Sequence, residues 1–225
     1  MLVLRNITKT FNPSGPGRCT ALKDLDLSIP LGRVSVITGP SGSGKTTLLS
    51  LVGCLLRPTS GRIFLGEMEI TGLPERFMSL VRRDRFGFVF QHFNLIRGVS
   101  AVENVMLPGY PTGIPRSKLL AKAEGLLSGL GIAAKSKVRV ERLSGGEQQR
   151  VAIARALIND PDIILADEPS AHLDTEMAAD FMETAGSLAE EGITVLISTH
   201  DPVLYQSPCV DRVIRLRNGE LLGDQ

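Results

Sequence analysis

Short apolar runs recur along the chain, separated by longer stretches with helical periodicity. Residues 163–166 and 194–198 are almost entirely aliphatic or β-branched, which is typical of strands buried on both faces of a parallel sheet. Four further strands are expected, at residues 2–4, 25–29, 33–38 and 86–90. Because strands alternate with helices, the pattern predicts an α/β fold with a mostly parallel sheet.

The predicted helices are concentrated in the middle of the chain. They are expected at residues 45–52, 102–106, 116–130, 145–157 and 175–190. Residues 91–158 hold three of these helices and no predicted strand, so we expect this stretch to be a helical insertion. Residues 1–90 and 159–225 would then form the sheet-based core of a single domain that spans residues 1–225.

Composition narrows the classes of function. The chain has 43% hydrophobic and 22% charged residues, and its formal net charge of +1 gives no electrostatic case for nucleic acid as a partner. We expect no signal peptide, and no apolar run approaches the roughly 18 residues that span a bilayer. Cys19, Cys54 and Cys209 have neither metal nor disulfide spacing, which favours ordinary thiols in a reducing cytosol.

A phosphate-binding loop follows the strand at residues 33–38. It consists of Gly39, Pro40, Ser41, Gly42, Ser43, Gly44, Lys45 and Thr46. The glycines let backbone N–H groups close around phosphate oxygens. Lys45 brings a positive charge to the outer phosphates, and the Thr46 hydroxyl can bind Mg²⁺. The motif and its strand-to-helix setting predict a nucleoside triphosphatase.

Polar residues follow three other predicted strands, at the edge where parallel strands end together. Asp167 is expected to support Mg²⁺ there. Glu168, which strand alternation turns the other way, is placed to polarise an attacking water. His200 could donate to the γ-phosphate. Gln91 ends the strand at residues 86–90 and could contact both Mg²⁺ and the water.

A second anion-binding motif opens the helix predicted at residues 145–157. It is the octapeptide Leu143-Ser144-Gly145-Gly146-Glu147-Gln148-Gln149-Arg150. A hydroxyl and two glycines at a helix start are suited to hold an anion, because free N–H groups and the positive end of the helix dipole point the same way. Since the chain already has a complete phosphate site, the question is whose phosphate this second motif holds.

These motifs resemble those of the ATP-binding cassette (ABC) ATPases in order and spacing, over essentially the whole chain. The resemblance implies a P-loop, RecA-like α/β core with an N-terminal antiparallel β-subdomain. It also implies that residues 91–158 form a helical subdomain carrying the octapeptide. Phe11 matches the family's aromatic residue that stacks on adenine. Asp174 matches a loop that crosses between subunits, Gln91 the Q-loop and His200 the switch histidine.

The implied cofactors are ATP and Mg²⁺. The catalytic residues would be Glu168, His200, Gln91 and Lys45, and the metal would be bound by Thr46, Gln91 and Asp167. Nucleotide contacts would come from Phe11, the loop from Gly39 to Thr46, Thr47, Ser144, Gly145, Gly146 and Asp174. Two cassettes pack head to tail in this family, so that Ser144 and Gly146 of one copy contact the γ-phosphate bound by the other.

A narrower resemblance lies in residues 88–96 and 101–108, which look like the lipoprotein-release and macrolide-export cassettes. Cell-division and antimicrobial-peptide-resistance cassettes share much of this segment. Because the segment starts at the Q-loop, where the family meets its membrane subunits, it indicates the type of permease partner. The missing transmembrane segment implies that these integral-membrane permease subunits are separate chains, and that the cassette is peripheral at the cytoplasmic face of the inner membrane. Val140, Ser170 and His172 depart from the residues usual in the family, without removing a catalytic group.

Three functions remain open from the sequence. The first is an ATPase that powers an export or lipoprotein-release transporter through ATP-driven dimer closure. The second is an ATP-dependent switch of a non-transport membrane scaffold of the cell-division type, which the sequence barely separates from the first. A soluble ABC protein for DNA repair or ribosome work is disfavoured, because the interval 91–143 is too short for a coiled coil and there is one cassette. The transported substrate is left open, since a cassette need not touch it.

Overall fold

The computed structural model describes residues 1–13, 15–171 and 173–224; Ser14, in the loop expected at residues 12–17, and His172 lie outside the described residues. In chain order the elements are β1 (Leu2–Phe11), β2 (Cys19–Ile29), β3 (Val34–Thr38), α1 (Lys45–Val52), β4 (Ser60–Leu65), β5 (Met68–Glu69), α2 (Glu75–Arg85), β6 (Phe86–Val89), α3 (Ala101–Met106), η1 (Leu107–Thr112), α4 (Arg116–Gly129), η2 (Ala133–Lys135), η3 (Val140–Arg142), α5 (Gly145–Leu157), β7 (Ile163–Asp167), α6 (Thr175–Glu190), β8 (Thr194–Thr199), α7 (Pro202–Tyr205), β9 (Arg212–Arg217) and β10 (Glu220–Asp224). The predicted α/β fold is confirmed.

The central sheet has the strand order β10-β9-β3-β8-β7-β6. Its strands from β6 to β9 run parallel, and β10 is antiparallel to β9. Alternate side chains of β7 face two different apolar clusters. Ile163 and Leu165 pack in the cluster that contains α1, whereas Ile164 and Ala166 pack in the cluster that contains α5 and α6. Helices therefore cover both faces of this sheet, as the apolar strand sequences predict.

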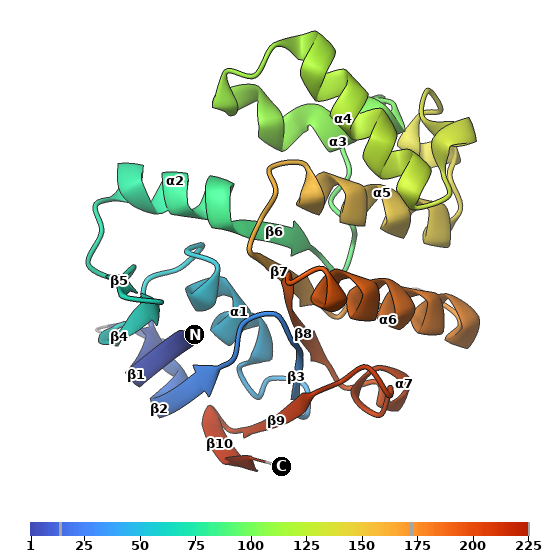
Figure 1. Cartoon of the computed structure of the whole chain (residues 1–225). Coiled ribbons are helices and arrows are strands. Elements are labelled where there is room, and N and C mark those ends of the chain that lie inside the picture. The colour runs from blue at the N-terminus through green and yellow to red at the C-terminus, as the bar shows by residue number, and fades with distance from the viewer. Residues whose placement is uncertain (14, 172, 225) are drawn as a thin grey trace.

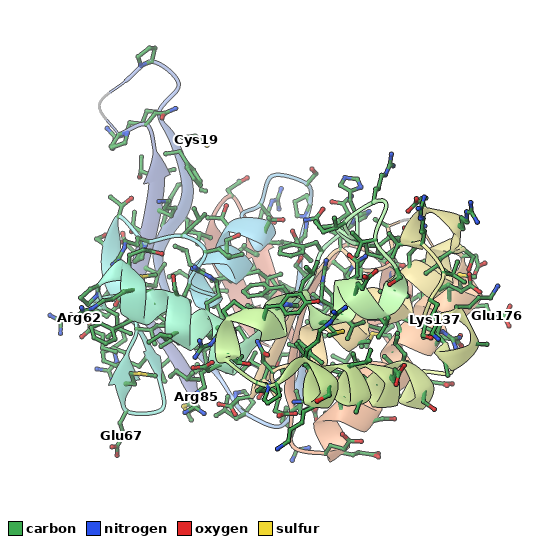
Figure 2. All side chains as sticks on the ribbon, turned by 90° about the horizontal axis from the view of Figure 1, so that it is seen from above. Cys19, Arg62, Glu67, Arg85, Lys137 and Glu176 are labelled. Atoms are coloured by element: carbon green, nitrogen blue, oxygen red, sulfur yellow. The ribbon has the colours of Figure 1, made fainter. Side chains whose placement is uncertain are left out.

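A second, antiparallel sheet has the order β2-β1-β4-β5. Its inner side chains, including Leu4 and Ile7, join the cluster around α1. The hairpin of β1 and β2 extends out from the body of the molecule, with Cys19 near its end (Figure 2). Both strands are longer than predicted, because the register shifts near Asn6 and Asp24, whose φ angles are 49° and 41°. Such irregularities interrupt the apolar–polar alternation on which the prediction depends.

Helices α3, α4 and α5 form a layer at one end of the molecule, above the strands β6 to β8 (Figure 1). They enclose an apolar cluster of their own, which includes Val105, Leu119 and Ala154. Helix α5 belongs to two clusters at once: Ala154 faces α3 and α4, while Ile153 faces the central sheet. Helix α5, which the octapeptide begins and which we call the signature helix, therefore joins the helical layer to the sheet.

Several elements were not predicted. Helix α2 buries only Met78 and carries four arginines, so its sequence is strongly polar overall. Strands β4, β5 and β10 are short and partly exposed, which weakens their signal. Strand β9 was also missed, although its alternating sequence indicates a strand. Across the described ranges, helices are either too short or too polar to span a bilayer.

Candidate phosphate sites at two helix N-termini

The predicted catalytic residues leave the same edge of the central sheet. Parallel strands β3, β6, β7 and β8 all end there (Figure 1). The last aligned pairs are Thr38 with Thr199, Asp167 with Ser198, and Val89 with Ala166. The phosphate loop, Glu168, His200 and the Gln91 turn therefore start within a few residues of one another at the carboxyl edge, where ligands bind in open α/β sheets.

Backbone packing shapes the phosphate loop between β3 and α1. A Cβ atom at Gly39 would lie 2.0 Å from the Leu216 carbonyl oxygen. Gly44 is the N-cap residue of α1 with a left-handed φ of 105°, and a Cβ atom there would lie 2.5 Å from the Ala21 carbonyl oxygen. Both positions exclude a side chain, because the loop backbone passes close to the backbone of neighbouring strands. Between them, Pro40, Ser41 and Gly42 are exposed and Ser43 is buried.

Lys45 is held at the start of α1 by three acceptors. Its Nζ donates to the carbonyl oxygens of Gly39 (2.9 Å) and Pro40 (3.3 Å). The third neighbour is Glu168 Oε1, at 3.4 Å. The Lys45 side chain is only 7% exposed, so its charge is concentrated inside the loop. An ammonium has three donors, and a phosphate in this loop would take over some of these contacts.

Asp167 lies beside Thr46, the next residue of α1. The Thr46 hydroxyl donates to Asp167 Oδ1 at 2.9 Å, and the Ser198 hydroxyl donates to the same oxygen. A hydroxyl and a carboxylate side by side next to a phosphate loop are the oxygen ligands that Mg²⁺ prefers. Clusters of three His, Cys, Asp or Glu side chains suited to a metal are absent among the described residues. The Thr46 and Asp167 oxygens would fit an ion whose other ligands are phosphate and water.

Glu168 and His200 contact each other. His200 Nδ1 lies 3.0 Å from both Glu168 carboxylate oxygens. The Glu168 side chain is 13% exposed and that of His200 is 71% exposed. The predicted reason for the direction of Glu168 is wrong: β7 ends at Asp167, and Glu168 has a left-handed φ of 45°. The turn, not strand alternation, brings its carboxylate between Lys45 and His200.

Three predicted residues lie outside this set of contacts. Gln91 is exposed in the turn that follows β6. Phe11 is 37% exposed at the end of β1, where the Lys9 ammonium lies 5.0 Å from its ring centroid. Thr47 is half-buried in the first turn of α1. Thr47 thus directly follows the loop, Gln91 lies at the carboxyl edge of the central sheet, and Phe11 lies in the antiparallel sheet, paired with Cys19. Their contacts with a ligand stay predictions.

The octapeptide starts α5, as predicted, but its N-terminus is capped from within. The Ser144 hydroxyl accepts a bond from the Glu147 amide (3.3 Å), and Glu147 Oε2 accepts one from the Ser144 amide (2.8 Å). This reciprocal capping box uses donors that an anion would otherwise find free. The carboxylate also offsets the positive end of the helix dipole. Ser144 itself remains exposed.

A groove of about 900 Å³ lies in front of Ser144 and is also lined by Gly146 and Asp174. Both cations on its described lining are paired: Lys135 with Glu147 (3.7 Å) and Arg150 with Asp180 (3.1 Å). Figure 2 shows Lys137 and Glu176 at this end of the molecule, away from Arg62 and Glu67. The groove thus offers a hydroxyl and helix amides. On its described lining the side chains of Lys135 and Arg150 are 49% and 44% exposed, whereas that of Lys45 is 7% exposed, so neither cation is enclosed as Lys45 is.

Asp174 joins the groove to the signature helix through α6. It is the N-cap residue of α6 and accepts a bond from the Met177 amide at 2.9 Å. The Met177 side chain covers Gly146, where a Cβ atom would lie 2.8 Å from its Sδ. Met177 and Ser198 were not predicted. A polar Ser198 inside an apolar strand is a usable signal, whereas the position of Met177 is known only from the packing.

The sequence and the fold are both similar to those of known proteins. A family model described as "ABC transporter" matches residues 22–171. The macrolide export ATP-binding/permease protein MacB of Rhodopseudomonas palustris (strain HaA2) is 43% identical over 222 residues, which are 99% of this chain and 34% of that protein. The pyoverdine export ATP-binding/permease protein PvdT of Pseudomonas fluorescens (strain Pf-5) is 42% identical over 224 residues, 100% of this chain and 34% of that protein. The chain spans about a third of the length of these curated relatives.

A solved structure matches the chain over its full length. The dimeric structure of MJ0796, described as a bacterial ABC transporter cassette, superposes with a TM-score of 0.90 at 39% identity. The match covers 100% of this chain and 98% of that one. A second dimeric structure of MJ0796, in a post-hydrolysis state bound to ADP and Pi, matches with the same TM-score.

Proposed function

Because this chain belongs to the ABC transporter family, we propose that it is the ATP-hydrolysing cassette of an export-type or lipoprotein-release membrane complex. The observation that carries the proposal is the contact set Lys45–Glu168–His200 at the mouth of the phosphate loop. It combines a buried cation, a carboxylate and an imidazole at one point. In a phosphate-binding site this combination suits phosphoryl transfer to water.

The phosphate loop would bind the triphosphate. Its path, closed to side chains at Gly39 and Gly44, lets amides approach the phosphates. When bound, Mg²⁺ neutralises charge on the outer phosphates. Thr46, Asp167 and Gln91 would hold it, and the adjacent Thr46 and Asp167 oxygens already fit such an ion. Phe11 would stack on the adenine ring.

Glu168 would act as the general base. Its carboxylate is nearly buried yet reaches His200 and Lys45, so it is placed to accept a proton from water next to the outer phosphate. His200 would orient Glu168 and donate to the phosphoryl oxygens. Lys45 would stabilise the charge that develops there.

The second site would act on the nucleotide of another copy of this chain. Ser144, Gly145 and Gly146 offer donors, but the cations on the described lining of their groove are about half exposed and are not enclosed as Lys45 is. A triphosphate would therefore have to arrive already bound to another copy's Lys45. The dimeric state of the similar MJ0796 structures supports this arrangement. Asp174, in the same groove, would contribute from the loop between subunits.

The partner of the dimer would be an integral-membrane permease, with the cassette at the cytoplasmic face of the inner membrane. A cavity of about 310 Å³ opens between the central sheet and the helical layer, lined by Phe88, Phe90 and Pro108 with Arg82 and Arg83. The similar proteins are named export ATP-binding/permease proteins, which supports a permease contact. We place the boundary of the moving helical subdomain at residues 91–158.

The experiment that tests this function is Glu168→Gln. Loss of the carboxylate should lower ATP turnover by about 100-fold or more, an amount typical for a group that acts in the transition state. ATP binding should persist, and light scattering should detect an ATP-dependent dimer. The matched control is Glu190→Gln at the exposed end of α6, which should hydrolyse ATP normally. Unchanged turnover in Glu168→Gln would remove Glu168 from the role of base.

A further inference from the structure

Arg155, on the signature helix α5, binds the turn that carries Gln91. Its Nη1 donates to the Asn94 carbonyl oxygen and its Nη2 to the Phe93 carbonyl oxygen, both at 2.6 Å. Burial lowers the pKa of the Arg155 guanidinium, and the group remains charged because an arginine does not deprotonate in proteins. Bonds from a charged donor are about twice as strong as neutral ones, so this is a firm attachment.

The turn has a backbone conformation that needs such support. Phe93 and Asn94 have left-handed φ angles of 57° and 49°, which non-glycine residues rarely adopt. The Phe93 ring is buried in the cluster that includes Ala152 and Ile153 of α5. The carboxyl-terminal end of the Gln91 turn thus rests on α5 through both its ring and its carbonyl groups.

The other end of the turn is fixed to the central sheet. Strand β6 pairs with β7, and its last aligned residue, Val89, lies opposite Ala166, one residue before Asp167. Gln91 follows Val89 by two residues. It is therefore held between two bodies: the sheet edge that carries Asp167, and the helix that begins at Ser144.

We propose that Arg155 is a positioning residue that ties Gln91 to the signature helix. A shift of α5 against the central sheet would then move Gln91 toward or away from the ion beside Asp167. This inference rests on the proposed function, in which Gln91 contacts Mg²⁺. It links the Ser144 end of α5, which serves one nucleotide, to the Gln91 turn, which serves the other.

The alternative is that Arg155 merely stabilises the fold. Arg57 provides a matched control, because its guanidinium also donates to two backbone carbonyls, those of Thr71 (3.1 Å) and Leu73 (2.7 Å). Those carbonyls belong to the antiparallel-sheet region, away from Gln91. Arg57→Met should therefore remove the same kind of bonds without changing turnover.

The test combines Arg155→Met, Gln91→Ala and the double variant in the full chain with ATP and Mg²⁺. Arg155→Met should lower kcat about tenfold, roughly the effect of 1.4 kcal/mol, and leave KM for ATP within about twofold. Added to Gln91→Ala, it should change kcat by less than about twofold, because coupled residues are not additive. Hydrogen exchange at the Phe93 and Asn94 amides should accelerate in Arg155→Met and stay slow in Arg57→Met.

Arg155→Lys keeps the charge on a compact ammonium that cannot span both carbonyls well. It should give intermediate kcat and exchange, and it is measured in the same way if Arg155→Met does not fold. Multiplicative losses in the double variant, or unchanged exchange in the turn, would overturn the proposal. Full turnover by Gln91→Ala alone would instead remove the metal role of Gln91 from the proposed function, while exchange in the turn still decides whether Arg155 holds it.

Discussion

The N-termini of α1 and α5 both carry anion-binding motifs, but the charges around them differ. At α1 the N-cap is Gly44, no acidic residue lies in the first turn, and Lys45 is enclosed by carbonyl groups and Glu168. At α5 the N-cap is Ser144, which is capped by Glu147 from within the same turn. At α1 the Lys45 ammonium adds to the positive end of the helix dipole, whereas at α5 the Glu147 carboxylate offsets it.

This difference teaches that similar local motifs can be a whole site or half of one. The α1 site has a cation, two adjacent oxygen groups suited to a metal and a carboxylate, all from one chain. The α5 site has an exposed hydroxyl and a groove whose two described cations, Lys135 and Arg150, are about half exposed instead of enclosed. This difference supports the proposal that the α5 motif completes the nucleotide site of another copy.

Gly39→Ala, which alters only the α1 site, should have the largest effect. Its Cβ would lie 2.0 Å from the Leu216 carbonyl oxygen, and neither backbone can yield cheaply. We expect the free energy of unfolding to fall by about 3 kcal/mol, at the high end for overpacking, and ATP binding to be lost. Urea unfolding and nucleotide titration measure both. Gly113→Ala is the control, since φ is 77° there but the surrounding space is open; equal losses in both variants would contradict the role of the clash.

Ser144→Arg should change hydrolysis without changing binding. The long side chain would fill the groove in front of α5, while the contacts of Lys45 stay intact. We expect kcat to fall by about 100-fold, as when an oxyanion donor is removed, with the ATP dissociation constant unaltered. Ser117→Arg, at an exposed position of α4, is the control. Weakened ATP binding to the single chain would mean that Ser144 belongs to its own chain's site.

Gly146→Ala should have a smaller effect, on stability, which a second substitution at Met177 should relieve. Its Cβ would meet Met177 Sδ at 2.8 Å, at the flexible end of a side chain, so we expect a loss of about 1 kcal/mol in stability. Shortening the neighbour, in Gly146→Ala with Met177→Ala, should leave stability no lower than Met177→Ala alone. Calorimetry of the four proteins in this cycle measures the coupling. If the two changes in the free energy of unfolding were strictly additive, the Met177 side chain would not be what restricts residue 146.

The smallest effect is expected from Glu147→Gln. Glutamine preserves the capping box but removes the negative charge next to Ser144. The helix dipole would then attract another copy's phosphates more strongly, by about 0.3–1 kcal/mol. Sedimentation with ATP should show a dimer several-fold tighter at low salt, and the gain should shrink at high salt. A weaker dimer would show that Glu147 supports the contact instead.

Much of the central sheet and of the α1 site could be predicted, because their signals are local. The apolar runs predicted β7 and β8, and the phosphate-loop spacing predicted the start of α1 at Lys45. The direction of Glu168 was predicted for the wrong reason, since its left-handed turn depends on a bond to Ser198 in the neighbouring strand. Long-range contacts such as Met177 on Gly146, or Arg155 on the Gln91 turn, have no local pattern that reveals them.

The central claim is that Ser144 serves the nucleotide of another copy, and mixing two inactive variants tests it most directly. Lys45→Ala keeps its α5 site and Ser144→Arg keeps its α1 site, so a mixed dimer has one working composite site. ATPase activity of an equal mixture should rise to about a quarter of the unmodified level, because half of randomly paired two-fold dimers are mixed. A mixture no more active than its components, or full activity of Ser144→Arg on its own, would contradict the account.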